Sequence, residues 1–334
     1  MATAIICEFN PFHNGHAYLL SEAKRLTGEP NMVIMSGSFT QRGEVAVCDK
    51  FTRAAAALRH GADLVVELPT AFAVANAERF AQGGVRIAKF FSGVHTLAFG
   101  CETDNLDALR AAAAAIRSER VNALIAAEMR GGGYYPRALE EALRTVCGGE
   151  VAAAVSSPNN ILAVEYIRAL EGTEIRPLPI MRQGAAHDSD EIVGGYVSAS
   201  FIRENLLKGN IGYTERFMPP ALRGKINECD IADISRLERA ILSVLRTKSA
   251  DDFKSLPDLS EGLENKLQFS ARVAGSLDEL YNMIKTKRYT LARVRHLVLS
   301  AFLEFDNQFF MATPPYVRLL GFSATGEAHL KKLA

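Results

Sequence analysis

Short apolar runs alternate with helically spaced apolar residues along the first 181 positions of the chain. The runs of strand length occupy residues 4–7, 31–35, 64–68, 96–99, 151–155 and 175–181. Between these runs, apolar residues recur every three or four positions, a spacing that predicts helices. The predicted helices span residues 19–26, 52–60, 80–91, 106–129 (with room for one break) and 161–170. Alternating strands and helices predict an α/β fold, with a mostly parallel sheet covered on both faces.

After residue 212 the strand signals fade and helical spacing dominates. Apolar residues repeat every three or four positions in residues 231–246, 276–283 and 291–305, and prolines and glycines mark the turns. We therefore predict two domains. Residues 1–212 form the sheet domain, and residues 213–334 form a smaller all-α domain.

Polar and glycine-rich blocks follow the predicted strands at the points where each one ends. These blocks are residues 10–16, 36–42, 100, 157–160 and 182. The carboxyl ends of parallel strands meet at one edge of a sheet, and ligands of open α/β sheets bind outside that edge. The pattern therefore predicts one ligand site to which all these blocks contribute.

The first block contains His13-Asn14-Gly15-His16, where a strand passes into a helix. The first turn of a helix has unpaired N–H groups and a partial positive charge, which favour an anion such as phosphate. His13 and His16 fall on one side of that turn, where two ring N–H groups can bind phosphate oxygens and stabilise a leaving pyrophosphate. Gly15 lets a ligand approach the backbone closely. The alternative is that one or both histidines only cap the helix or pack.

The other blocks supply further candidates, each with a structural alternative. Arg42 can bind a carboxylate or phosphate, or its loop can be a plain surface loop. Gly100 can let a nucleoside lie against the backbone, or it can be a simple turn at a strand end. Of Asn159 and Asn160, we expect one to cap a helix and the other to reach a nucleotide.

A further helix start lies at residues 198–203, with Ser198 or Ser200 as its cap and Arg203 in the first two turns. An arginine at this place can neutralise charge on a leaving pyrophosphate. The alternative is an ordinary capped helix with a surface arginine.

Composition narrows the function classes. The 38 lysines and arginines balance 38 aspartates and glutamates, so bulk charge alone does not indicate a nucleic-acid partner. From Ser200 onward, however, 20 basic residues stand against 16 acidic ones, a net charge of +4 that is compatible with RNA contact. The five cysteines are widely spaced and form no Cys-x-x-Cys pair, which fits reduced thiols in a cytosol and argues against a disulfide or zinc framework.

The apolar segments argue against export and membrane insertion. The first apolar run has no basic leader and is interrupted by Glu8, so we expect no signal peptide. No uncharged apolar run approaches the roughly 20 residues that a membrane-spanning helix needs. We therefore expect a cytoplasmic protein without a membrane partner.

The block Glu8-Phe9-Asn10-Pro11-Phe12-His13-Asn14-Gly15-His16 ends in a His-x-Gly-His motif that resembles the signature of the nucleotidylyltransferase superfamily. The whole string is similar to that of one group, the bacterial tRNA(Met) cytidine acetate ligase family. Further resembling blocks are residues 35–44, 63–69, 99–102 and 157–162, so the resemblance covers nearly all of the first two thirds of the chain. It implies a Rossmann-like nucleotidylyltransferase sheet in residues 1–212, which binds ATP, and a tRNA-binding role for residues 213–334.

The resemblance implies an ATP-dependent ligase. ATP and acetate form acetyl-adenylate with release of pyrophosphate, and the acetyl group passes to N4 of the wobble cytidine of elongator tRNA(Met). Magnesium is expected with ATP, although no carboxylate cluster in the sequence looks like a dedicated metal cage. Two alternatives stay open: an adenylyltransferase for another small substrate, and a non-catalytic nucleotide- or RNA-binding protein that has kept the fold.

The resemblance also assigns roles to individual residues. His13, His16 and Arg203 act in catalysis by holding the phosphates and balancing their charge. The residues assigned to ATP binding are Ile6, Cys7, Glu8, Phe9, Asn10, Pro11, Phe12, His13, Asn14, Gly15, His16, Ala17, Tyr18, Leu19, Gly100, Asn159, Asn160 and Arg182. After Arg182, His187-Asp188 resembles a His-Asp pair of the family, although Ala186 stands where a tyrosine is expected.

For tRNA, we assign Arg42 and the densest basic cluster of the helical region, in which Tyr289 can stack on a base. The cluster consists of Lys285, Lys287, Arg288, Arg293, Arg295 and His296. Without the resemblance, a solvated helix start with ordinary surface charge explains this cluster slightly better.

Overall fold

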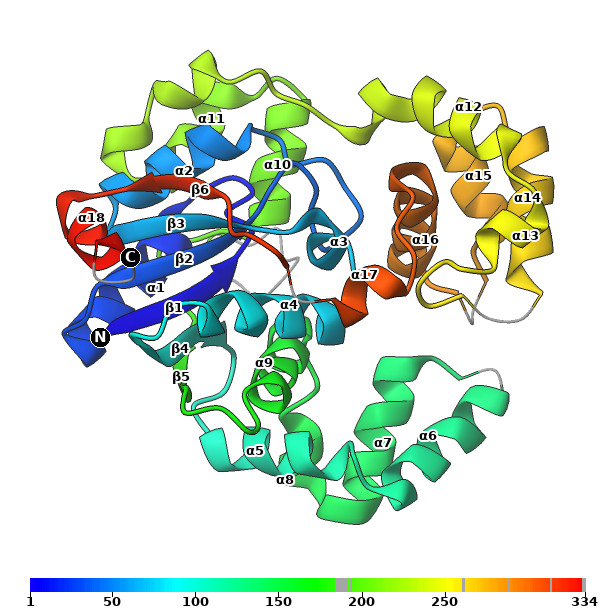
Figure 1. Ribbon diagram of the computed structural model, residues 1–334, viewed down its shortest axis with the longest axis horizontal. Helices are drawn as coiled ribbons and strands as arrows, with labels where there is room; N and C mark the ends of the chain where they lie inside the picture. The colour runs from blue at the N-terminus through cyan, green and yellow to red at the C-terminus, as the bar shows by residue number, and fades with distance from the viewer. Residues whose placement is uncertain are drawn as a thin grey trace.

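A six-stranded sheet forms the centre of the molecule. The computed structural model describes residues 1–131, 133–183, 192, 194–259, 262–286, 289–312 and 314–331. The strands lie in the order β5-β4-β1-β2-β3-β6 (Figure 1). They are β1 (Ala2–Cys7), β2 (Asn31–Ser36), β3 (Ala62–Leu68), β4 (Val94–Cys101), β5 (Arg176–Met181) and β6 (Leu319–Phe322). Neighbouring strands are parallel except β6, which runs antiparallel to β3, so the predicted mostly parallel sheet is confirmed.

Helices cover both faces of the sheet because successive side chains of a strand point to opposite faces. Ile5, Val33 and Val65 lie on one face, in a buried cluster with apolar residues of α1 (Asn14–Thr27) and α2 (Lys50–Arg59). Strands β1, β2 and β3 are buried on both faces, which explains their continuous apolar runs.

The opposite face is formed by the alternate residues Ile6, Ile34 and Val66. They belong to a second buried cluster with apolar residues of α4 (Ala77–Lys89) and α9 (Pro158–Ala169). The doubly covered sheet that the sequence predicts is therefore present, and the carboxyl ends of β1, β2 and β4 meet at one edge.

A group of helices separates β4 from α9 and lies along the bottom of Figure 1. Ser118 caps its second helix by accepting a hydrogen bond from the backbone N–H of Val121, so the long predicted helix is broken at this point. The group consists of α5 (Leu106–Ala115), α6 (Glu119–Arg130), α7 (Tyr135–Cys147) and α8 (Gly149–Ala153).

The prediction of a strand at residues 151–155 was wrong, because these residues complete α8 and the turn after it. Ala152 and Val155 are buried among the neighbouring helices rather than in the sheet. A run of five small apolar residues satisfies a buried helix as well as a buried strand, and periodicity alone does not separate the two.

A separate helical unit, residues 234–303, has its own hydrophobic core (upper right in Figure 1). Leu242, Leu267, Leu280 and Val298 pack in this core. The unit consists of η4 (Ile234–Leu237), α12 (Glu238–Thr247), α13 (Ala250–Phe253), α14 (Leu263–Val273), α15 (Leu277–Ile284) and α16 (Leu291–Leu303). The helices predicted for this part of the chain are therefore present.

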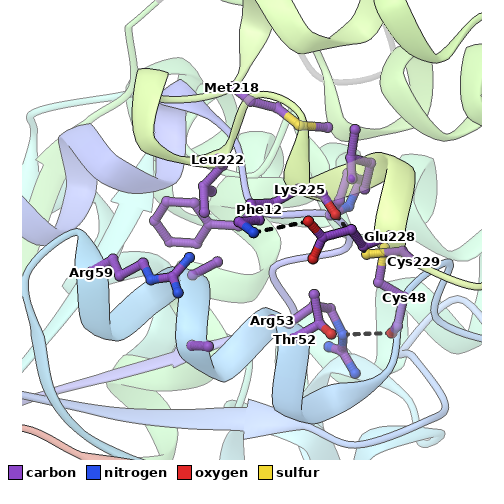
Figure 2. A pocket seen from close by; sticks show the side chains of 14 residues that line it. Phe12, Cys48, Thr52, Arg53, Arg59, Met218, Leu222, Lys225, Glu228 and Cys229 are labelled. Atoms are coloured by element: carbon purple, nitrogen blue, oxygen red, sulfur yellow. Dashed lines mark hydrogen bonds and ion pairs between the residues drawn. The ribbon is translucent and has the colours of Figure 1, made fainter.

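The segment that leads into the helical unit packs on the sheet domain instead. It contains α10 (Ala199–Leu207), α11 (Ile211–Thr214), η1 (Glu215–Phe217), η2 (Pro220–Leu222) and η3 (Lys225–Glu228). Met218, Leu222 and Ile226 join the buried cluster of α2, and together they border a cavity of about 280 Å³ (Figure 2). Packing therefore places these residues with the sheet domain.

The end of the described chain also returns to the sheet, which corrects the prediction of an all-α region up to residue 334. After the short α17 (Gln308–Met311), β6 pairs with β3, and α18 (Ala324–Leu330) follows it. A strand of four residues is too short to show a period of two, and Gly321 within it weakens the signal further. The short α3 (Thr70–Ala73), which follows β3, completes the described helices.

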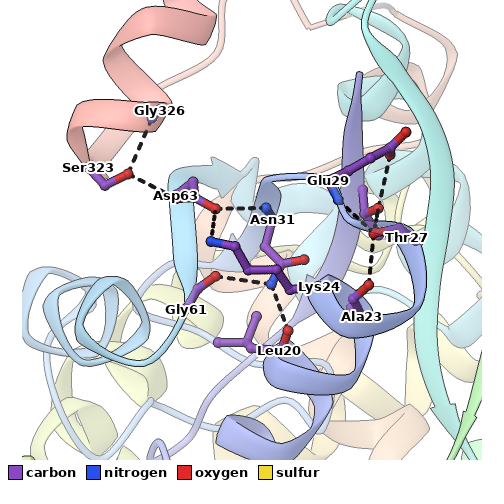
Figure 3. A network of polar contacts seen from close by, with 11 residues as sticks. Leu20, Ala23, Lys24, Thr27, Glu29, Asn31, Gly61, Asp63, Ser323 and Gly326 are labelled. Carbon is purple, nitrogen blue, oxygen red and sulfur yellow. Dashed lines mark hydrogen bonds and ion pairs between the residues drawn. The ribbon is translucent and has the colours of Figure 1, made fainter.

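A polar network closes the amino edge of the sheet (Figure 3). The carboxylate of Asp63 accepts hydrogen bonds from the backbone N–H of Asn31 (3.0 Å), from Lys24 Nζ (3.2 Å) and from Ser323 Oγ (3.1 Å). Asn31 Nδ2 donates to two backbone carbonyls, those of Leu20 and Gly61. The network therefore ties α1, β2, β3 and the returning chain together.

Candidate active site

The two histidines of the motif hold each other at the start of α1. His13 is the N-cap: its Nδ1 accepts a hydrogen bond from the backbone N–H of Gly15 (3.0 Å). His16 completes a capping box, because its Nδ1 accepts from the backbone N–H of His13 (3.3 Å). The rings stack with their centroids 3.8 Å apart. Since each Nδ1 is an acceptor, each neutral ring carries its hydrogen on Nε2.

Capping and ligand binding are therefore not alternatives at this helix start. The cap fixes the ring orientation and the tautomer through Nδ1, and the Nε2–H group of each ring is the donor that a ligand can use. Both rings line the main cleft at the carboxyl edge of the sheet. The geometry gives two N–H donors beside the first turn of a helix, where an anion is favoured.

Burial keeps both rings neutral. It lowers the pKa of His13 from 6.5 to about 3, and it lowers the pKa of His16 well below 6.5. The positive charges of Arg182 and Arg203 act in the same direction on both rings. At neutral pH the histidines therefore donate hydrogen bonds without carrying charge, and the positive charge of the site comes from the arginines.

Arg203 is placed by the start of α10. Ser198 caps that helix by accepting from the backbone N–H of Phe201 (3.0 Å), as one of the two predicted caps. One turn later, Arg203 donates from Nη1 to the backbone carbonyl of Asn10 (3.0 Å) and from Nη2 to Ser200 Oγ (2.9 Å). These bonds fix a guanidinium beside the turn that carries the histidines.

Arg42 reaches the same place from the loop after β2. Its Nη1 donates to Ser200 Oγ at 3.3 Å, so one hydroxyl accepts from Arg42 and from Arg203. Two guanidiniums from segments about 160 residues apart therefore lie beside one another at the cleft. Such a pair suits a ligand with several negative charges, such as a triphosphate.

The opposite wall of the cleft is built by the ends of β4 and β5 and by the start of α9. Asn159 Nδ2 donates to Glu102 Oε1 (2.7 Å), and Asn160 Oδ1 accepts from the backbone N–H of Glu102 (2.7 Å). The expectation that one asparagine caps α9 was wrong, because Ser157 is the cap. Serine before a proline at the first helical position is the stronger start signal.

Most of the predicted ATP-binding residues lie around one cleft of about 430 Å³. Among them, those that line the cleft are Ile6, Cys7, Glu8, Phe9, Asn10, His13, His16, Leu19, Gly100, Asn159 and Arg182. Arg203 and Arg42 line it too. Gly100 lies inside β4, and a Cβ there would make an ordinary contact of 3.4 Å with Arg182 Cγ.

The other predicted residues lie next to the cleft rather than in its lining. Pro11 and Phe12 border the second cavity, and the Phe12 ring packs 5.7 Å from that of His16. Gly15 and Tyr18 border a small hollow that also touches His13 and Arg182. Asn14 Nδ2 donates to the carbonyl of Gly195 (3.4 Å). Ala17 and Asn160 do not appear in the cleft lining either, and His187-Asp188 lies outside the described residues.

Two kinds of residue at this edge were not predicted from the sequence. Tyr134 and Pro136, at the start of α7, line the cleft from a helical group that carries no polar block. Arg53 on α2 is buried, only 2% exposed, and donates to the carbonyls of Glu8, Ser36, Gly37 and Cys48 (Figure 2 shows the last bond). The sequence signal that could have indicated this buried arginine is its position on the inner face of an alanine-rich helix.

Glu8 is the acidic residue of the turn after β1. Its Oε1 accepts from the backbone N–H of Gln41, and burial raises the pKa of its carboxyl group. The bond ties the end of β1 to the loop after β2. The two loops that carry Asn10 and Arg42 are thereby fixed to each other.

The residues of the basic cluster predicted to bind tRNA lie in different environments. Lys285 is exposed, whereas Lys287 and Arg288 lie outside the described residues. Arg293 donates to the carbonyl of Asp258 (2.6 Å) and lies over the ring of Tyr289. Arg295 pairs with Glu44, which belongs to the loop after β2. An RNA-binding role for these side chains stays a prediction.

The described residues contain neither a membrane-spanning helix nor a cluster of metal-ligating side chains. None of their helices has the length and apolar character needed to cross a bilayer. Nor do the described histidine, cysteine and acidic side chains gather in groups of three or more that could hold a metal ion.

Comparison with known proteins places the chain beside one family. A family model described as HIGH Nucleotidyl Transferase matches residues 1–334. The tRNA(Met) cytidine acetate ligase of Thermoanaerobacter sp. (strain X514) is 34% identical over 340 residues, which cover 98% of this chain and 85% of that protein. The ligase of the same name from Syntrophomonas wolfei is 39% identical over 350 residues, covering 98% and 83% respectively.

Solved structures agree with this placement. Apo TmcAL from Thermotoga maritima superposes with a TM-score of 0.90 at 32% identity, over 99% of this chain and 83% of that one. The same protein bound with alpha-thio ATP superposes with a TM-score of 0.88, at the same identity and coverage.

Proposed function

Because the chain belongs to the tRNA(Met) cytidine acetate ligase family of HIGH nucleotidyl transferases, we propose that it is an ATP-dependent ligase that acetylates N4 of the wobble cytidine of elongator tRNA(Met). The observation that carries this proposal is the pair of neutral imidazoles at the start of α1. Their tautomers are fixed by the capping box, and two guanidiniums lie at the same cleft.

ATP is the first substrate of the proposed reaction. The Nε2–H groups of His13 and His16 bind phosphate oxygens, while Arg203 and Arg182 balance their charge. Asn10, Gly100 and Asn159 border the proposed nucleoside position. The side chain of Asn159 is held there by its hydrogen bond to Glu102. A solved relative of this chain, the Thermotoga maritima TmcAL, binds alpha-thio ATP, which supports ATP as the ligand here.

In the first step, a carboxylate oxygen of acetate forms a bond to the α-phosphorus of ATP. The bond from that phosphorus to the bridging oxygen breaks, and pyrophosphate leaves with the electron pair. Acetate must approach in line with the leaving group, and holding both in that orientation supplies much of the rate. The histidines and Arg203 stabilise the charge that grows on pyrophosphate, so they act mainly in the transition state.

In the second step, the N4 amine of the cytidine attacks the acetyl carbon of acetyl-adenylate. The bond to AMP breaks, AMP leaves with the electron pair, and N4 loses one proton. Neither step needs a covalent intermediate on the protein. We propose that the helical region, with its excess of basic residues, binds the tRNA, and that Arg42 contacts the substrates at the cleft.

Magnesium would reach the site with ATP. The described residues hold no side-chain cluster suited to a metal ion, so we propose that the phosphates of ATP hold it. Its contribution would be to neutralise phosphate charge. Because its proposed partner is tRNA, we place the protein in the cytoplasm.

The proposal is tested by assaying the purified chain with ATP, acetate and tRNA(Met). We expect pyrophosphate exchange into ATP that requires acetate, and acetylated cytidine that requires tRNA(Met) as well. The double variant His13→Ala/His16→Ala should lower exchange by at least about 100-fold while circular dichroism stays unchanged. Binding of ATP and RNA without either product would contradict the proposal and favour a non-catalytic protein.

A further inference from the structure

A tight hairpin, residues 38–46, connects β2 to α2 beside the candidate active site. Phe39 and Val45 form an antiparallel bridge, and the backbone N–H of Thr40 donates to the carbonyl of Glu44 (3.0 Å). At the tip, the N–H of Gly43 donates to the carbonyl of Thr40 (2.9 Å). The loop that looks like a flexible connection in the sequence is therefore a hydrogen-bonded hairpin of defined shape.

One side of this hairpin is pressed against the helical unit. A Cβ on Gly43 would lie 2.6 Å from Arg295 Cβ, and the φ angle of Gly43 is +71°, so both sterics and backbone require glycine. The ring Nε2 of His296 hydrogen-bonds the carbonyl of Gln41, and Phe39 packs against the core of the helical unit. The hairpin tip thus rests on helix α16.

The other side of the hairpin reaches the phosphate-binding residues. Arg42 donates to Ser200, and Gln41 donates from its backbone to Glu8. Glu44 Oε2 lies 4.0 Å from Nε of Arg203. Within nine residues, the chain therefore touches both the helical unit and the arginine proposed to act on the leaving pyrophosphate.

Glu44 contacts both the helical unit and Arg203 at the cleft. Its Oε1 accepts from Nη1 of Arg295, while its Oε2 faces Arg203, so one carboxylate is shared by two guanidiniums. The side chains of Glu44, Arg203 and Arg295 are 29%, 13% and 25% exposed. Water therefore screens these pairs less than it screens a surface ion pair.

We propose that Glu44 is a positioning residue that couples helix α16 to Arg203, so that RNA bound at the helical unit changes the adenylation step. This inference rests on the proposed function. A shift of α16 moves Arg295 and with it the Glu44 carboxylate, which changes the electrostatic contact of Glu44 with the guanidinium that Asn10 and Ser200 also hold. Since Arg203 acts on charge that develops in the transition state, the change falls on kcat of adenylation more than on KM for ATP.

The test is a double-mutant cycle on acetate-dependent pyrophosphate exchange, which requires no tRNA. Glu44→Gln should lower kcat of exchange roughly threefold to tenfold with a smaller change in KM for ATP. Arg295→Met should also lower kcat, although Arg295 lies on the far side of Glu44 from the cleft. In the Glu44→Gln background, Arg295→Met should have no further effect on exchange, because the link is already broken.

The controls separate coupling from stability and from the proposed function. Arg239→Met removes an exposed arginine of the same helical unit and should leave exchange unchanged. In the wild type, tRNA(Met) should change the exchange rate, and Glu44→Gln should abolish that response. The inference would be overturned if the effects of the two substitutions multiplied, or if the single variants matched wild type. In either case, acetylation of tRNA by the wild type would still support the proposed function. Absence of exchange in wild type would instead refute the function itself.

Discussion

The two edges of the sheet are both polar, but they use their polar groups differently. At the amino edge, the carboxylate of Asp63 accepts hydrogen bonds from the backbone N–H of Asn31 and from the side chains of Lys24 and Ser323 (Figure 3). At the carboxyl edge, His13 and His16 satisfy each other and the helix start through Nδ1, and their rings also border a cleft of about 430 Å³. The carboxylate of the first arrangement is bound by donors of the protein itself, whereas the imidazoles of the second retain N–H donors for a ligand.

The treatment of charge differs in the same way. The amino edge pairs a buried carboxylate with a lysine and neutral donors, so little net charge is left there. The carboxyl edge keeps its histidines neutral by burial and gathers guanidiniums around them. A site built for a polyanion needs such an excess of positive charge, whereas a structural network is stable without one. From this difference we expect substitutions at the amino edge to change stability and substitutions at the carboxyl edge to change activity.

The largest effect is expected from the substitution His13→Asn. Asparagine is a good N-cap and can accept from the backbone N–H groups of the first turn, but it lacks the Nε2–H donor. We expect acetate-dependent exchange to fall by about 100- to 1,000-fold, as for the loss of one donor to a developing charge. The urea midpoint should stay close to that of wild type. Unchanged exchange would show that His13 is only a cap.

The matching change at the amino edge is Asp63→Ala. It leaves the N–H of Asn31 and the hydroxyl of Ser323 without their acceptor, and Asp63 itself is only 6% exposed. We expect the free energy of unfolding to fall by about 2–3 kcal/mol. The KM for ATP and kcat of the folded enzyme should not change. A loss of activity without a loss of stability would contradict the division between the edges.

The dependence of stability on pH tests the neutral state of His13. Its pKa is 6.5 in the unfolded chain and about 3 in the folded protein, so both states are neutral above pH 6.5. As the pH falls below 6.5, the unfolded chain binds a proton that the folded protein does not, and stability is lost until the pH reaches about 3. Between pH 7 and 5 this costs about 2 kcal/mol. Urea titrations at pH 7 and pH 5 should show that the free energy of unfolding falls by about 2 kcal/mol less in His13→Asn than in wild type. Equal losses in the two proteins would contradict a neutral His13 ring.

The smallest effect is expected from Lys24→Ala. The lysine side chain is 49% exposed, and its bond to Asp63 is one of three that the carboxylate accepts. A partly exposed ion pair contributes about 1 kcal/mol or less, so the free energy of unfolding should fall by no more than that. Thermal unfolding of Lys24→Ala and Asp63→Ala side by side measures the ratio. A lysine variant as unstable as the aspartate variant would mean that the ion pair, not the hydrogen bonds, holds this edge.

The parts of the molecule that follow from local signals were predictable. Continuous apolar runs marked β1 to β4, and the polar blocks after them marked the carboxyl edge where the cleft lies. Local signals failed where two structures satisfy the same pattern. Residues 151–155 form a helix because small apolar residues suit either state, and Ser157 rather than an asparagine caps α9 because the proline after it fixes the helix start.

The remaining features depend on residues that are far apart in the sequence. Glu44 and Arg295 are separated by 251 positions, and neither segment carries a local sequence signal that predicts their contact. Tyr134 reaches the cleft only because the helices between β4 and α9 fold back beside the sheet. Strand β6 is found at the sheet edge only through its pairing with β3. Tertiary packing, rather than propensity, decides each of these positions.

A crystal structure of this chain with a non-hydrolysable ATP analogue would show directly where the nucleotide binds. The proposed site requires triphosphate oxygens about 2.7–3.2 Å from Nε2 of both His13 and His16, with the nucleoside toward Gly100. A triphosphate bound instead in the cavity between α2 and residues 218–229, with both imidazoles contacting only solvent, would contradict it.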